Sequence, residues 1–110
     1  MLSIIDDAYT KFQKIHFLLG EMESTNNLDF TQLSDATQVA YIAMNEGMCV
    51  NTTVCHECAK HRDFLQEMIE VVEELENRVP LTQKYRDALA AYAIMVNETL
   101  KKIALARDSL

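Results

Sequence analysis

The sequence predicts an all-α protein, a single domain over residues 1–110 in which four helices form a bundle. Its 110 residues include only 2 Gly and 1 Pro, too few turn formers for a fold of many short strands. Apolar residues recur at steps of three and four along most of the chain, which is helical spacing. Hydrophobic residues make up 49% and charged residues 25%, the composition of an ordinary domain with one core.

The first helix is expected over residues 2–19. Ser3 can cap its start, and Gly20 is well placed to end it. The polar residues that follow, 21–28, are expected to form a loop. The apolar stripe of this helix contains Ile5, Tyr9, Phe12, Ile15 and Leu19.

The second helix is expected over residues 31–45. Asp29 and Gln32 resemble a capping box at its start, and Gly47 is expected to stop it. Its stripe contains Leu33, Ala36, either Val39 or Ala40, and Ala43.

The third helix, expected over residues 53–78, has the most regular pattern in the chain. Alternating steps of four and three place apolar residues, with one cysteine and one histidine, on the a and d positions of a heptad seam. Pro80 is expected to end the helix, because proline disfavours the α conformation of the residue before it. The seam contains Val54, Cys58, His61, Leu65, Met68, Val72, Leu75 and Val79.

The fourth helix is expected over residues 81–107, and the short turn before it predicts an antiparallel hairpin with the third. Opposite charges on the two helices favour the same pairing. Between Asp63 and Asn77 there are six acidic residues and no base, whereas from Leu81 onward five bases outnumber three acids. The stripe of the fourth helix contains Tyr85, Leu89, Tyr92, Val96, Leu100 and Ile103.

The formal net charge of −7 predicts a protein that does not bind nucleic acid or an anionic membrane directly. The acidic run of the third helix predicts instead a contact surface for a basic partner protein. A protein that binds nucleic acid is an example of such a partner. The residues expected to carry this contact are Asp63, Glu67, Glu70, Glu73 and Glu74.

All three cysteines and two of the three histidines lie between Cys49 and His61. Together Cys49, Cys55, Cys58 and His61 make a Cys₃His set, which can hold one structural zinc ion. The alternative is core packing, because Cys58 and His61 fall on the heptad seam, where a thiol packs as a small hydrophobe. In that case the protein has no cofactor.

The same segment contains two motifs that resemble catalytic ones. His56 and His61 are five residues apart, about 140° around a helix, so they do not form the metal site of an HExxH protease. Cys55 and Cys58 form a Cys-x-x-Cys pair near a helix start, which suits thiol redox chemistry or ligand binding. Thioredoxin-like enzymes place that motif in a βαβ unit, and the chain predicts no strands.

The function expected is therefore that of a small interaction module, an adaptor or inhibitor and not an enzyme. Small inhibitors and adaptors that bacteriophages make against host machinery often have this size and charge, so an origin in a phage or mobile element is expected. Carboxylates on such a protein can block a nucleic-acid channel in place of phosphates. A zinc-stabilised binding domain and a small thiol redox protein are the alternatives. A cytoplasmic setting is expected, because no basic leader or long apolar stretch occurs. A homodimer is also expected, through outward-pointing Ile94, Met95 and Leu105.

Overall fold

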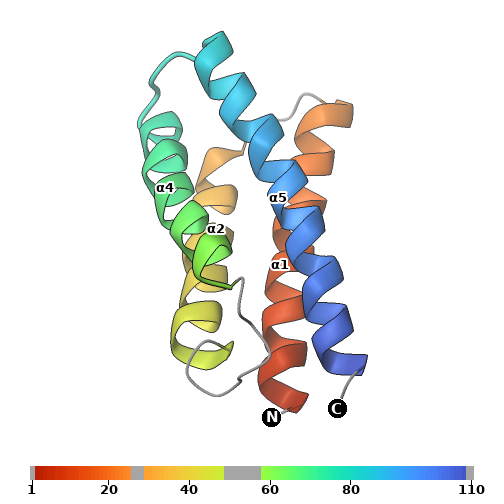
Figure 1. The fold of residues 1–110 in the computed structure, drawn as a ribbon. Coiled ribbons are helices and arrows are strands. Elements are labelled where there is room, and N and C mark those ends of the chain that lie inside the picture. The colour runs from red at the N-terminus through yellow and green to blue at the C-terminus, as the bar shows by residue number, and fades with distance from the viewer. Residues whose placement is uncertain (1, 26–28, 49–57, 109–110) are drawn as a thin grey trace.

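The computed structural model describes residues 2–25, 29–48 and 58–108, almost all of them helical. Figure 1 shows the helices packed into one bundle, as the sequence predicts. In chain order they are α1 (Leu2–Thr25), α2 (Phe30–Ile42), the π-helix η1 (Ala43–Met48), α4 (Cys58–Glu76) and α5 (Gln83–Asp108). Within these ranges every helix is too short or too polar to cross a membrane.

The bundle is antiparallel from one helix to the next (Figure 1). α1 and α4 run in one direction along the molecule, and α2 and α5 run in the other. The most extensive helix contacts are those of α5 with α1 and of α4 with α2. The start of α1 and the end of α5 lie at the same end of the bundle, where Arg107 Nη1 of α5 lies 3.7 Å from Asp6 Oδ1 of α1.

α4 and α5 are consecutive and antiparallel, which confirms the predicted hairpin. Each of them nevertheless packs more extensively against another helix than against its hairpin partner. The contacts that join the two include Phe64 and Tyr92, whose ring centroids are 6.4 Å apart. The Tyr85 hydroxyl also donates a hydrogen bond to the Glu74 carboxylate.

One hydrophobic core runs along the bundle and takes side chains from each helix. Fully burying an aliphatic or aromatic side chain of this size stabilises a fold by about 1.5–3 kcal/mol. The stripes predicted for α1 and α5 are largely confirmed, since most of their members are buried and the others half-buried. The largest fully buried side chains include Phe12, Ile5, Ile15, Leu33, Met44, Leu65, Val72, Tyr92, Val96 and Ile103.

The predicted end of the first helix at Gly20 is wrong, because α1 continues to Thr25. Leu18 and Leu19 are buried just before the glycine, and Met22 packs against the core just after it. Apolar packing on both sides of Gly20 outweighs the entropic cost of one glycine, which is about 1 kcal/mol in a helix.

The second helix begins as predicted. The Asp29 side chain caps it by accepting a hydrogen bond from the Gln32 backbone N–H at 3.1 Å. Gly47 does not stop the helical backbone, which changes at Ala43 from α to the wider π form and runs to Met48. A Cβ on Gly47 would lie 3.3 Å from Ile4 Cγ2, so this glycine allows η1 to approach α1 closely.

The third helix ends before the proline that was expected to end it. Arg78 adopts a left-handed backbone with φ of 67°. The Val79 N–H donates to the Glu74 carbonyl and the Arg78 N–H to the Leu75 carbonyl, each at 3.1 Å, which is the Schellman arrangement. α4 therefore ends at Glu76. Its predicted start at residue 53 lies outside the described residues.

Candidate functional site

The acidic side chains of α4 lie on the side of the helix that faces away from the core. The seam predicted for this helix is confirmed at its described helical positions, His61, Leu65, Met68, Val72 and Leu75, which are buried. Val79 follows the end of α4 and is 37% exposed, so its place in the seam was wrongly predicted. Burial of one face fixes the opposite face in solvent.

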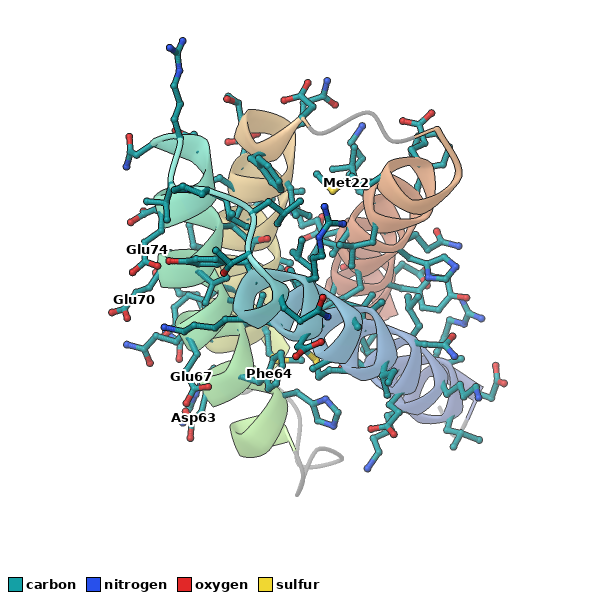
Figure 2. The ribbon with its side chains drawn as sticks, turned by 90° about the horizontal axis from the view of Figure 1, so that it is seen from above. Met22, Asp63, Phe64, Glu67, Glu70 and Glu74 are labelled. Atoms are coloured by element: carbon teal, nitrogen blue, oxygen red, sulfur yellow. The ribbon has the colours of Figure 1, made fainter. Side chains whose placement is uncertain are left out.

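We call Asp63, Glu67, Glu70 and Glu74 the acidic ridge. All four are exposed, and Figure 2 shows them one after another along the outer side of α4. A rise of 1.5 Å per residue separates the first from the last by about 16 Å along the helix axis. Such a row of like charges creates a negative potential that steers oppositely charged molecules towards it.

The middle of the acidic ridge is its most available part. Asp63 has the neighbouring Arg62 Nε at 3.6 Å, in an exposed pair that contributes little. Glu67 and Glu70 make no side-chain hydrogen bond or ion pair with any residue in the described ranges. These two carboxylates can therefore meet a partner without first breaking a contact of their own.

The end of the ridge is tied to α5. The Glu74 carboxylate accepts the hydrogen bond of Tyr85, and this bond raises the pKa of the Tyr85 phenol above its ordinary value. Glu73 lies beside the ridge, turned towards α2, where the Gln38 amide donates to its carboxylate at 3.5 Å. The structure thus separates the five predicted acidic contact residues into an outward row of four and one that faces α2.

His61, a predicted zinc ligand, lies in a buried polar cluster. Its Nδ1 is 2.6 Å from Thr99 Oγ1, and that hydroxyl donates to the Met95 carbonyl at 2.8 Å. The hydroxyl has one hydrogen, so Nδ1 donates to Thr99 in the tautomer that leaves this hydrogen on the Met95 carbonyl, and in the other tautomer Nδ1 accepts it; Nδ1 is engaged in both cases. A metal ion held by His61 would therefore have to be bound through Nε2.

The remaining zinc ligands predicted from sequence, Cys49, Cys55 and Cys58, lie outside the residues whose side chains are described. Among those that are described, no group of three or more histidine, cysteine or acidic residues is arranged to hold a metal ion. The zinc site and the Cys-x-x-Cys redox site both remain predictions.

Two of the three apolar residues expected on the outside of α5 are there. Ile94 is 64% and Leu105 is 69% exposed. The outward position predicted for Met95 is wrong, because Met95 is 7% exposed and packs in the core, with its sulfur 3.1 Å from Thr99 Oγ1. The spacing explains this, since Met95 is three residues from buried Tyr92 and four from buried Thr99.

A surface groove between α1 and α2 was missed from the sequence. Three hollows follow one another along this seam, the two larger with volumes of about 480 and 300 Å³. The sequence of α2 contains an indication of this groove. Val39 and Ala40 are alternatives for the same position in its apolar stripe, so one of them is expected on the surface. Ala40 is fully buried and Val39 is 36% exposed, which leaves an apolar side chain on the surface.

The chain matches no protein family, and neither a curated protein nor a solved structure is significantly similar to it.

Proposed function

We propose that this protein is an interaction module that binds a basic partner protein through the acidic ridge of α4. The observation that carries the proposal is the row of four exposed carboxylates opposite the buried seam, with Glu67 and Glu70 unengaged within the described residues. Binding of this kind needs no reacting group. It needs charges held in a fixed row. α4 can hold its carboxylates in such a row, because its opposite face is packed against the core.

The geometry favours partners that bind nucleic acid. The ridge presents one carboxylate per about 5.5 Å of helix axis, and a strand of duplex DNA presents one phosphate per about 3.4 Å of its axis. A lysine- or arginine-rich groove shaped for phosphates can therefore pair with several of these carboxylates at once. The net charge of −7 adds long-range attraction to such a partner.

The experiment compares three immobilised proteins as baits. They are the wild type, the ridge variant Glu67→Lys/Glu70→Lys, and the control Asp87→Lys/Glu98→Lys, which makes the same charge change on exposed positions of α5. Proteins retained by the wild type and the control but lost from the ridge variant are identified by mass spectrometry. They are expected to be basic, and their retention is expected to fall steeply as salt is raised.

Two outcomes would contradict the proposal. Equal loss from both variants would show that only the overall charge matters. Equal retention by all three baits would show that partners bind another surface. Far-UV circular dichroism of each bait checks that the substitutions leave the helices intact.

We also propose self-association through the outer face of α5. The exposure of Ile94 and Leu105, one above the other on the side opposite the core, supports it. Sedimentation equilibrium of the wild type is expected to show dimers that Ile94→Lys removes. A wild type that stays monomeric at high micromolar concentration contradicts this proposal and leaves the first one standing.

A further inference from the structure

Three neighbouring hollows lie between α1 and α2. The largest hollow is lined by Ile4, Asp7, Lys11, Val39, Ile42, Ala43, Glu46 and Gly47. The next shares Lys11 and Val39 with it and adds Lys14, Gln32, Asp35 and Ala36. A small third hollow of about 30 Å³ shares Gln32 and continues to Met22. We call this row of three hollows the α1–α2 groove.

The groove has an apolar strip that the core does not use. Val39 is 36% and Ile42 is 52% exposed, although both belong to the helix that buries Leu33 and Ala40. Ile4 is half-buried beside them. Two of the large exposed hydrophobic residues of the described chain therefore lie side by side in one hollow.

The rim of the groove is predominantly acidic. Of its two lysines, Lys11 is already paired with the Asp7 carboxylate, at 2.6 Å. On the α2 side Asp35 and Glu46 are exposed near the apolar strip. The acidic rim residues are Asp7, Glu21, Asp29, Asp35 and Glu46, against Lys11 and Lys14.

The backbone of the groove decides the form of its occupant. Both walls are helices, whose backbone N–H and C=O groups bond within the helix along its length. An extended peptide would find no sheet edge to join, so strand addition does not apply. A helix needs no such edge, and it can lay an apolar stripe along the trough. The distance from Ile4 to Met22 along α1 is about 27 Å, the length of a helix of about 18 residues.

We propose that the α1–α2 groove binds an amphipathic helix of a partner protein, with an aliphatic stripe flanked by lysine or arginine. The stripe would cover Val39 and Ile42, and the flanking cations would face Asp35 and Glu46. A second copy of this chain is a poorer occupant, because it would bring a net charge of −7 to an acidic rim. The groove residues are distinct from those of the acidic ridge, so the two proposals are tested separately.

The test uses synthetic, fluorescein-labelled peptides of about 18 residues, with leucine or isoleucine at heptad a and d positions and lysine beside them. A control peptide has the same composition in scrambled order. Fluorescence anisotropy measures their binding to the wild type, to Val39→Ser/Ile42→Ser, and to the matched variant Phe17→Ser/Val79→Ser, whose two exposed side chains lie outside the groove and the α5 face. Each variant removes two exposed apolar side chains and no charge, so both are expected to fold.

The amphipathic peptide is expected to bind the wild type at least about tenfold more tightly than the scrambled one. The groove variant is expected to lose about tenfold in affinity, and the Phe17→Ser/Val79→Ser control to lose nothing. Amide chemical-shift changes in the ¹⁵N-labelled protein are expected along α1, α2 and η1.

Three results of the peptide experiment would overturn the proposal: no binding at millimolar peptide, equal loss in both variants, or shift changes that gather on α4. A Glu67→Gln/Glu70→Gln protein that binds the peptide like the wild type would show that the groove acts without the ridge. A dimer of the wild type that the groove variant abolishes would replace the proposed partner with a second copy.

Discussion

Arg78 is the residue whose backbone decides where α4 stops. It occupies the left-handed conformation at the position that follows the C-cap, where glycine is the usual residue. For a residue with a Cβ, that conformation costs about 1–2 kcal/mol. The two capping hydrogen bonds offset this cost, because they form only in this geometry and let the chain turn towards α5.

Replacing Arg78 with glycine is therefore expected to stabilise the protein. Relief of the left-handed strain exceeds the extra freedom of glycine in the unfolded chain, leaving a net gain of about 0.5–1 kcal/mol. Urea unfolding followed by circular dichroism measures it. Glu76→Gly, two residues earlier in right-handed helix, is the control and is expected to destabilise by about 1 kcal/mol. Loss of stability in Arg78→Gly would contradict this account.

Tyr92 makes the free energy of unfolding depend on pH in the alkaline range. Burial raises the pKa of its phenol well above the ordinary value of 10.0, so the group stays neutral in the fold. In the unfolded chain it ionises near pH 10, and its contribution is therefore complete below pH 10 and lost as the pH rises further. Urea unfolding between about pH 9 and 11 is expected to show a shallower decline for Tyr92→Phe than for the wild type.

Because of the hydrogen bond that the same hydroxyl makes, Tyr92→Phe and Thr37→Val are expected to lower the free energy of unfolding by different amounts at neutral pH. Thr37 Oγ1 donates to the Leu33 carbonyl at 2.6 Å and so accepts from the Tyr92 hydroxyl, 2.8 Å away. Tyr92→Phe leaves no donor unpaired and is expected to cost about 1 kcal/mol. Thr37→Val leaves the buried Tyr92 hydroxyl without its acceptor and is expected to cost about 1–3 kcal/mol. A pH decline unchanged in Tyr92→Phe would contradict the role assigned to the phenol.

Among the elements, α1 offers the simplest improvement. Gly20 lies in the interior of the helix with its surface in solvent, and a Cβ there would meet nothing within 4 Å. Gly20→Ala is therefore expected to raise the free energy of unfolding by about 1 kcal/mol, measured in urea. Gly47→Ala is the matched control, because its Cβ would press on Ile4 Cγ2 and its gain should be smaller or negative. Equal gains at both sites would contradict the contact argument.

The existence and faces of the helices could be predicted from sequence because burial imposes a period. His61, Leu65 and Met68 repeat at helical steps, and the seam they form is the buried face of α4. Ends were harder to predict because a glycine or proline is only one contribution among several. Leu19 and Met22 outweigh Gly20, and the left-handed Arg78 ends α4 before Pro80 can. The residue pattern of the η1 segment did not predict its π-helical form.

At the scale of the whole molecule, the acidic ridge was predictable and the groove was not. The ridge is a property of one helix, so the positions of Glu67 and Glu70 in the sequence place them on one face. The groove belongs to two helices, and Ile4 and Ile42 meet there only because α1 packs beside α2. The spacing of residues within a helix does not indicate which helices pack side by side, whereas the exposed side of a single amphipathic helix follows from its period.

The ridge should also lower the stability of the protein that carries it. Asp63, Glu67, Glu70 and Glu74 are neighbours at steps of three and four, and each like-charge pair of this kind destabilises a helix by about 0.2–0.5 kcal/mol. Glu67→Gln/Glu70→Gln removes the charges and keeps the shape. Its free energy of unfolding is expected to exceed that of the wild type by about 0.5–1 kcal/mol at low salt.

Salt distinguishes this repulsion from a change in packing. The Debye length falls to about 3 Å at 1 M ionic strength, so the advantage of the neutral variant should vanish there. The control Asp87→Asn/Glu98→Gln, on a helix with a surplus of bases, should gain nothing at any salt concentration. A gain that persists at high salt would mean that Glu67 and Glu70 act through packing. A gain that disappears would mean that their charge costs stability, as expected of residues that serve binding.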